Sequence, residues 1–161
     1  MLYANGPSEL INPTDLAGIS GLDFIRGILE GRLPAPPIGK TLGYQMHAVE
    51  EGRVCFRGAP SFEVCNPLGT VHGGWYGTLL DSAMACAVQT RLPVGTAYTT
   101  LEYKINIIRS IPLDAEIECE GVAEHVGRST GVARGEIRGV EDGRLYATGS
   151  TTCIVLSLPR G

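Results

Sequence analysis

The chain reads Asn66-Pro-Leu-Gly-Thr-Val-His72-Gly73-Gly74-Trp-Tyr-Gly-Thr-Leu-Leu-Asp81 where a long, mostly apolar segment begins. After the glycine pair, residues 75–88 are rich in good helix formers, and the segment is too long for a strand. Polar and glycine residues before it mark the change from loop to helix. The sequence therefore predicts a helix that starts near Gly73.

The start of that helix is a candidate binding site for a substrate oxygen. The first turn of a helix carries unpaired backbone N–H groups and the positive end of the helix dipole. Because Gly73 and Gly74 have no side chain, an oxygen atom can approach the backbone closely there. Such donors form an oxyanion hole in outline, which stabilises the charge that develops on a carbonyl oxygen.

Asp81 follows about two helical turns after Gly73, and no Lys or Arg lies within one turn of it. A carboxylate among apolar residues costs free energy unless it is hydrogen-bonded or used in chemistry. One interpretation is that Asp81 marks a solvent-facing position of the helix. The apolar residues around it leave little polar stripe for such a face, so we favour a functional Asp81, with Asn66 and His72 upstream.

Length and charge limit the class of protein. A chain of 161 residues is enough for one domain. With 13 basic and 17 acidic residues and no Lys/Arg cluster, we expect neither nucleic acid nor a membrane surface as a partner. The 5 cysteines lack C-x-x-C spacing and the 3 histidines lack ligand spacing, which favours reduced thiols and no metal site. No signal segment is apparent, so we expect a cytoplasmic protein.

The pattern of elements predicts an α+β fold. We expect residues 1–19 to form a loosely packed N-terminal extension and residues 20–161 a single domain. Ser20, with Asp23 three positions later, predicts a short amphipathic helix that ends at Gly31 and covers an edge or the mouth of the domain. Extended segments are expected at residues 38–49, 53–58, 97–108, 115–126, 131–140 and 144–156.

The order is thus two strands, one long helix and four strands. Short turns, such as the hairpin signal at residues 141–143, make the last strands antiparallel neighbours, and the helix must then lie against the concave face of the sheet. Residues 127–131 match the G-x-S-x-G motif of hydrolases, but they lie between two extended segments and are interpreted as a hairpin.

The spacing Asn66-x5-His72-Gly73-Gly74-x6-Asp81, followed by Thr-Thr100-Leu-Glu-Tyr-Lys-Ile-Asn, resembles the PaaI-like acyl-CoA thioesterases of the hotdog superfamily. The similarity spans residues 21–156. The hotdog fold is a curled antiparallel sheet, here of about six strands, wrapped around one long central helix, with a short N-terminal helix in this chain. This architecture agrees with the order of elements described above.

The resemblance implies roles for particular residues. Asp81 matches the acid that acts as general base or nucleophile, and Gly73 matches the residue whose backbone N–H polarises the thioester carbonyl. Asn66 matches the residue that holds the carbonyl or the attacking water. His72 is expected to orient the site or the leaving thiol. Thr100 matches a Ser or Thr that positions the water, although Thr99 is an alternative for that place.

Substrate contacts and partners are implied as well. Gly74 and Thr99 are expected to contact the substrate, and Arg128 matches a basic position that contacts CoA phosphates, unless it is a solvated turn residue. The substrate is an acyl-CoA, with no cofactor beyond its own CoA. The family implies a homodimer, commonly paired into a tetramer, in which Asn66 and His72 of one subunit face Asp81 and Thr100 of the other.

Two other functions stay open at this stage. One is a hotdog enoyl-CoA hydratase or dehydratase, which uses a differently placed histidine and acid. The other is a non-catalytic acyl-CoA binding protein, which would have no need for Asp81. The acyl group is also open. We expect its pocket to be lined by the N-terminal helix and by Trp75, Tyr76, Leu79 and Tyr98.

Overall fold

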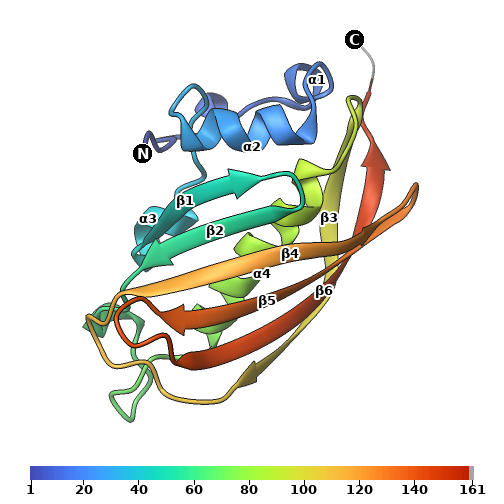
Figure 1. Ribbon diagram of the computed structural model, residues 1–161. Coiled ribbons are helices and arrows are strands. Elements are labelled where there is room, and N and C mark those ends of the chain that lie inside the picture. Colours follow the sequence, from blue (N-terminus) through green and yellow to red (C-terminus); the bar gives the residue numbers. More distant parts are fainter. Residues whose placement is uncertain (160–161) are drawn as a thin grey trace.

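The computed structural model describes residues 1–159 (Figure 1). It contains two short 3-10 turns, η1 (Pro7–Glu9) and η2 (Phe62–Val64). The helices are α1 (Pro13–Leu16), α2 (Gly21–Leu29), α3 (Ile38–Leu42) and α4 (Gly73–Thr90). The strands are β1 (Tyr44–Glu50), β2 (Arg53–Gly58), β3 (Thr96–Ile107), β4 (Ile117–Val126), β5 (Thr130–Gly139) and β6 (Leu145–Ser157).

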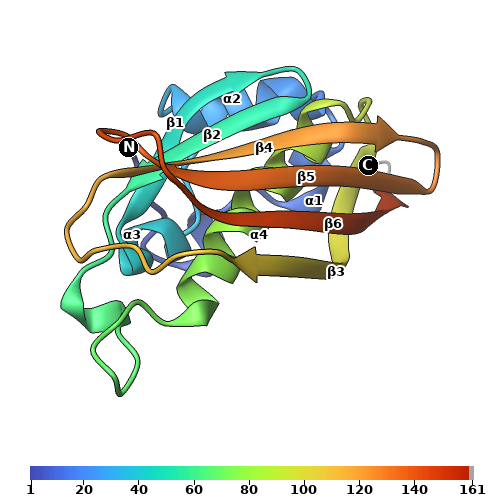
Figure 2. The same cartoon turned by 60° about the horizontal axis from the view of Figure 1, so that its bottom comes forward.

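The strands form one antiparallel sheet in the order β1-β2-β4-β5-β6-β3. The sheet curls, and α4 lies along its concave side (Figures 1 and 2). This arrangement confirms the predicted α+β fold with a hotdog architecture. The order leaves β1 and β3 at the two edges of the sheet, so part of α4 faces the space between those edges.

Alternating residues and glycines let the helix lie close to the sheet. In β4, Ile117, Cys119, Gly121 and Ala123 point inward and are buried. A Cβ atom on Gly121 would collide with the backbone carbonyl oxygen of Ala83 in α4. The backbone of the helix therefore touches the backbone of the strand, which only a glycine at this position allows.

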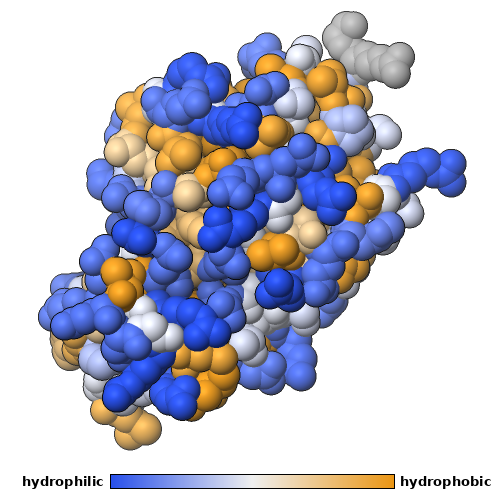
Figure 3. All heavy atoms as spheres, viewed as in Figure 1, coloured by the Kyte–Doolittle hydropathy of each residue, from blue (hydrophilic) through white to orange (hydrophobic). Residues whose placement is uncertain are grey.

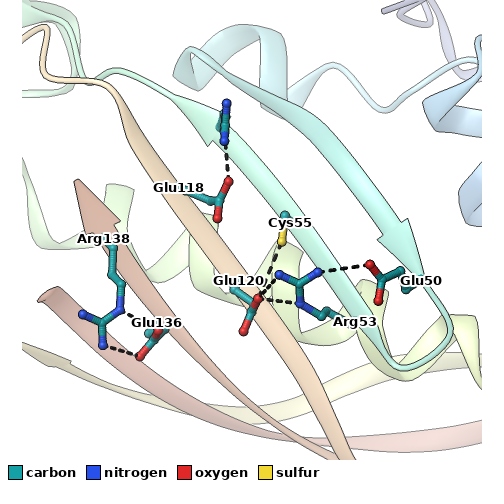
Figure 4. A network of polar contacts seen from close by, with 8 residues as sticks. Glu50, Arg53, Cys55, Glu118, Glu120, Glu136 and Arg138 are labelled. Carbon is teal, nitrogen blue, oxygen red and sulfur yellow. Dashed lines mark hydrogen bonds and ion pairs between the residues drawn. The ribbon is translucent and has the colours of Figure 1, made fainter. Parts of the chain in front are cut away.

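The outer face of the sheet is polar. Cross-strand ion pairs cover β2 and β4, with Arg53 Nε 2.6 Å from Glu120 Oε2 and Arg57 Nε 2.9 Å from Glu118 Oε2 (Figure 4). The space-filling view shows many hydrophilic side chains over this side of the molecule (Figure 3). Such partly exposed pairs add little stability, but together with the buried inner face they fix which side of the sheet receives α4.

Most predicted elements are confirmed, and one is wrong in part. The side chain of Ser20 caps α2 by accepting a hydrogen bond from the Asp23 N–H. The segment 38–49, predicted to be extended, begins instead with the helix α3 and becomes a strand only at Tyr44. The helix follows Pro37, whose ring fixes φ near the helical value, and it ends at Gly43, which has φ of 75°.

The first residues of the N-terminal segment are paired with the domain, whereas most of residues 5–19 are exposed or partly exposed. Tyr3 forms a parallel bridge with Ala35, in which Ala4 N–H donates to the Ala35 carbonyl at 3.0 Å and Ala35 N–H donates to the Leu2 carbonyl at 2.8 Å. Ala4 is only 6% exposed. The division of the chain at residue 20 stays a prediction. No helix within residues 1–159 has the length and apolar content needed to cross a membrane.

The close contact between α4 and β4 gives a test of the packing. Gly121→Ala should lower the free energy of unfolding by about 1–3 kcal/mol, because the added methyl forces the helix away from the strand. Chemical denaturation measures the change. Gly6→Ala is the control, since its Cβ atom would meet nothing within 4 Å. Equal stability of the two variants would contradict the described contact.

Candidate functional site

One face of α4 is covered by neither edge of the sheet. After the first turn, the only residues of α4 that are not fully buried are Thr78, Asp81, Ser82 and Cys86. Their spacing of three or four residues places them on one side of the helix. We call these four residues the α4 stripe. The sequence predicted almost no polar face on this helix, whereas the structure shows a narrow polar stripe.

The two edge strands border the α4 stripe. Thr100 of β3 donates a hydrogen bond from its hydroxyl to Asp81 Oδ1 at 3.0 Å. Burial raises the pKa of Asp81 above its usual value, and the hydrogen bond from Thr100 opposes this by lowering it. Asp81 forms no ion pair within residues 1–159. It is thus a half-buried carboxylate with one fixed donor, an arrangement suited to accepting a proton.

The structure distinguishes between the two neighbouring threonines. Thr99 and Thr100 point to opposite faces of β3, because side chains alternate along a strand. Thr99 is exposed, whereas Thr100 contacts Asp81. The pairing of β3 with β6 shifts register between Thr100 and Glu102, so a bulge lies beside this contact. Bulges of this kind often lie next to functional sites, where they re-aim a side chain.

On the β1 side, the hydroxyl groups of Ser82 and Tyr44 are hydrogen-bonded to each other. The Ser82 hydroxyl donates to the Thr78 carbonyl at 2.8 Å, and its oxygen lies 3.2 Å from the Tyr44 hydroxyl. Since the single proton of Ser82 is used, Tyr44 is the donor of this second bond. Cys86 follows one turn later, and burial raises the pKa of its thiol to about 12. At neutral pH the thiol stays protonated, which makes it unsuited to be a nucleophile.

At the start of α4, His72 caps the helix. Its Nδ1 accepts a hydrogen bond from the Gly74 N–H at 2.9 Å, and its carbonyl accepts one from Trp75 N–H at 3.0 Å. Within residues 1–159 the Gly73 N–H has no acceptor. Of the two glycines, then, Gly73 retains a donor that a ligand could use, and the N–H of Gly74 is occupied.

Asn66 shapes the loop before the helix. Its Oδ1 accepts from the N–H groups of Leu68 at 2.9 Å and Thr70 at 3.3 Å, and its Nδ2 donates to the Thr70 hydroxyl at 2.8 Å. These local bonds are typical of asparagine in turns. The loop between β2 and α4 projects from the body of the molecule (Figure 2). Within a single chain, the side chain of Asn66 therefore bonds to residues of its own loop.

Within a single chain the expected site residues form two separate groups. Asp81 and Thr100 lie together, whereas Asn66, His72, Gly73 and Gly74 gather at the start of the helix. The eight residue-to-residue steps from Gly73 to Asp81 correspond to about 12 Å along the helix axis. A small substrate could not contact both groups in one chain without a second copy or a large movement.

Arg128 lies apart from both groups, exposed in the turn between β4 and β5. In that turn the Gly127 N–H donates to the Thr130 carbonyl at 2.8 Å, which confirms that residues 127–131 form a hairpin rather than a hydrolase turn. Within residues 1–159, no three His, Cys, Asp or Glu side chains gather in a way that could hold a metal ion.

A cavity of about 400 Å³ lies beside the α4 stripe. Asp81, Ser82 and Cys86 line it from α4, and Tyr98 lines it from β3. Of the residues expected to line the acyl pocket, Tyr98 and the helix α2 line this cavity, whereas Trp75, Tyr76 and Leu79 do not.

These three residues belong to the core, with at most 3% of each exposed. The Trp75 ring N–H donates to the Leu42 carbonyl at 2.8 Å, and the Tyr76 hydroxyl accepts from the Ile111 N–H at 2.9 Å.

Sequence reasoning missed Tyr44 and Ser82. Ser82 could have been found from its spacing, because it lies on the same helical face as Thr78 and Cys86.

The comparisons with known proteins agree with this geometry. Residues 68–146 match the family model of the thioesterase superfamily. No curated protein sequence shows a significant match to the chain. Among solved structures, a phenylacetic acid degradation-related protein from Ralstonia eutropha is 28% identical, with a TM-score of 0.74, and the alignment covers 81% of this chain and 98% of that one.

Two further solved structures have similar values. A mutant of the phenylacetic acid degradation protein PaaI from Thermus thermophilus is 27% identical, with a TM-score of 0.66 and coverage of 73% and 97%. A hypothetical thioesterase from Streptococcus pneumoniae, solved with coenzyme A, is 26% identical, with a TM-score of 0.67 and coverage of 76% and 93%. Together with the fold, these matches confirm the resemblance to the PaaI-like thioesterases of the hotdog superfamily, and the protein is a thioester hydrolase.

Proposed function

We propose that the protein hydrolyses acyl-CoA thioesters to a free acid and CoA. The observation that carries this proposal is the Asp81 carboxylate, held by Thr100 at 3.0 Å and lining an apolar cavity. The match to the thioesterase superfamily supports the reaction type. The similar protein from Streptococcus pneumoniae was solved with coenzyme A, which supports CoA as the thiol part of the substrate.

In the proposed reaction, the thioester carbonyl oxygen lies at the start of α4 and accepts a hydrogen bond from the Gly73 N–H. Asp81 either removes a proton from a water held by Thr100 and Asn66, or attacks the carbonyl carbon to form a mixed anhydride that water then cleaves. In both cases the C–S bond breaks and CoA leaves as the thiol. His72 fixes the backbone at the helix start, and Arg128 is proposed to contact the phosphates of CoA.

We further propose that two copies of the chain build each site. Within residues 1–159, β3 pairs only with β6 and leaves its other edge open along 12 residues, and a long open edge favours pairing with a second strand. Apolar side chains of β3 and of the projecting loop are exposed, with Leu101 at 58% and Leu68 at 87%. Such exposure is typical of an interface.

A two-fold axis that relates two paired β3 strands reverses every direction perpendicular to the axis. The two α4 helices would therefore run antiparallel. The start of each helix then approaches the middle of the other. Gly73, His72 and Asn66 of one subunit would face Asp81 and Thr100 of the partner. This pairing joins the two groups that lie about 12 Å apart in one chain. Association of two such dimers into a tetramer is a further expectation from the family.

Asp81→Asn tests the base or nucleophile. The substitution keeps the size of the side chain but removes its ability to take a proton or attack, so kcat for an acyl-CoA should fall by about a hundredfold to ten-thousandfold. KM should change much less. Thiol release measures both constants. Hydrolysis at the wild-type rate by this variant would exclude the assigned role.

Thr100→Val tests the hydrogen bond to the acid. Without the hydroxyl donor the pKa of Asp81 rises further, since that bond lowers it in the wild type. Asp81 acts as the ionised form, so activity is lost as the pH falls through its pKa, and a higher pKa moves this acid limb of kcat/KM to higher pH. Thr99→Val is the matched control and should leave the acid limb in place. A shift in Thr99→Val alone would assign the role to Thr99 instead.

Gly73→Pro removes one N–H and little else. Gly73 is the first residue of α4, where proline is well tolerated, and His72 has ψ of 139°, which suits a residue before proline. Loss of an oxyanion donor should lower kcat by about a hundredfold to a thousandfold. Gly73→Ala keeps the N–H, and its Cβ would lie 3.5 Å from Ile107 Cδ1, an ordinary contact. It should stay at least about tenfold more active than the proline variant.

The same variants test the shared site. In a mixed dimer of Asp81→Asn and Gly73→Pro subunits, one of the two sites combines an intact Asp81 with an intact Gly73. Random mixing by co-expression should therefore restore about a quarter of wild-type activity if the sites follow two-fold symmetry. Each variant alone provides the baseline. No recovery on mixing, with mixed dimers present, would show that one chain supplies the whole site.

A further inference from the structure

The wall of the cavity opposite the α4 stripe comes from the N-terminal part of the chain. Phe24, Ile25 and Ile28 of α2 line it, and so do Leu10 and Ile11. Across the cavity lie Asp81 and its neighbours on α4. The catalytic carboxylate proposed above and this N-terminal wall therefore border the same space.

The N-terminal wall is fixed by backbone hydrogen bonds. The segment before η1 is joined to the residue Ala35 by the pair of bonds described above, at 3.0 and 2.8 Å. α2 packs on α4 so closely that a Cβ atom on Gly21 would overlap the backbone at Gln89. In Figure 1, α2 lies above β1, and it packs against both β1 and α4. The wall thus covers the cavity beside the α4 stripe, which Tyr98 of β3 also lines.

The chemistry of the lining limits what the cavity can hold. Aliphatic and aromatic side chains form most of it, including Met46 and Phe56 from the strands. No Lys, Arg or His side chain within residues 1–159 lines it, and Asp81 is its one acidic residue. The Ser82 and Tyr44 hydroxyls are paired with each other. The other polar residues of the lining, Tyr3, Gln45 and Tyr98, are uncharged. A charged group would therefore lose its water there without gaining a partner of opposite charge.

We propose that α2 and the N-terminal segment form the far wall of an acyl pocket and make the enzyme selective for apolar acyl groups, either medium-length aliphatic or aromatic. This inference rests on the acyl-CoA hydrolysis proposed above. With the carbonyl carbon at Asp81, the acyl chain extends between the α4 stripe and α2. A two-carbon acyl group leaves the cavity unfilled, and a dicarboxylic one places a carboxylate near Asp81 in apolar surroundings.

The test compares octanoyl-CoA and phenylacetyl-CoA with acetyl-CoA and succinyl-CoA. Each methylene that becomes buried improves kcat/KM by about fourfold, which corresponds to about 0.8 kcal/mol. Octanoyl-CoA should therefore exceed acetyl-CoA by at least about 100-fold. Succinyl-CoA should be hydrolysed no faster than acetyl-CoA. Equal kcat/KM for octanoyl, acetyl and succinyl substrates would overturn the inference.

Ile28→Phe tests the wall itself, because the larger ring fills the cavity from α2. The ratio of octanoyl-CoA to acetyl-CoA kcat/KM should fall at least about tenfold. Leu29→Phe is the matched control: it lies next in the same helix and does not line the cavity, so the ratio should stay unchanged. Ile11→Asp, which puts a charge into the N-terminal wall, should also lower the ratio, whereas Leu2→Asp, at an exposed position outside the lining, should not.

A binding measurement separates failure of this inference from failure of the proposed function. Octanamide should raise the Tm of the wild type, acetamide should not, and Ile28→Phe should reduce the shift, because a ligand that binds only the folded state stabilises it. If no acyl-CoA is hydrolysed but octanamide still raises Tm, the proposed function fails and the cavity assignment stands. If acyl-CoAs are hydrolysed without regard to the acyl group and octanamide has no effect, the cavity assignment alone fails.

Discussion

The six-stranded sheet curls around α4 without closing, and the position of every group discussed above depends on that gap. The sheet order places β1 and β3 at opposite edges, and each edge supplies one side chain to the same strip of the helix, Tyr44 from one and Thr100 from the other. Glycines such as Gly121 bring the helix against the strands. The remaining faces of α4 are therefore tightly packed, and a carboxylate is tolerated only on the strip between the edges.

The gap also explains the electrostatics of Asp81. The N-terminal segment and α2 cover the strip from the outside and exclude much of the water, which raises the pKa of the carboxyl group. One hydroxyl donor, from Thr100, partly offsets that cost. The neighbouring hydroxyls of Ser82 and Tyr44 bond to each other and to the helix backbone, so they leave the acid undisturbed. The covering segment thus shapes the cavity, and burial together with the Thr100 hydroxyl sets the direction in which the pKa of the acid shifts.

Sequence patterns predicted the features that depend on neighbouring residues. The glycine pair predicted where α4 begins, and the cap at Ser20 predicted α2, because both signals act within one helical turn. The proposed role of Asp81 followed from its apolar neighbours. The pairing with Thr100 was reached only through the family resemblance, since 19 positions separate the two residues.

Features that depend on distant contacts were harder to predict. The helix α3 was taken for a strand because five residues carry too little periodicity to decide. Trp75 and Tyr76 were placed in the pocket because an aromatic residue beside a glycine motif looks the same whether it faces a ligand or the core. The position of the first residues depends on an isolated bridge between Tyr3 and Ala35, which no local pattern reveals.

The backbone clasp between Leu2, Ala4 and Ala35 lies outside residues 68–146, the region that matches the superfamily model. That region holds Asp81, Thr100 and the helix start, whereas the clasp holds in place Tyr3 and Ala35, which border the cavity from the other side. Under the proposed function, reactivity and selectivity are thus encoded in different stretches of the chain. Changes in the N-terminal stretch would then alter which acids are released while the bond-breaking apparatus is inherited intact.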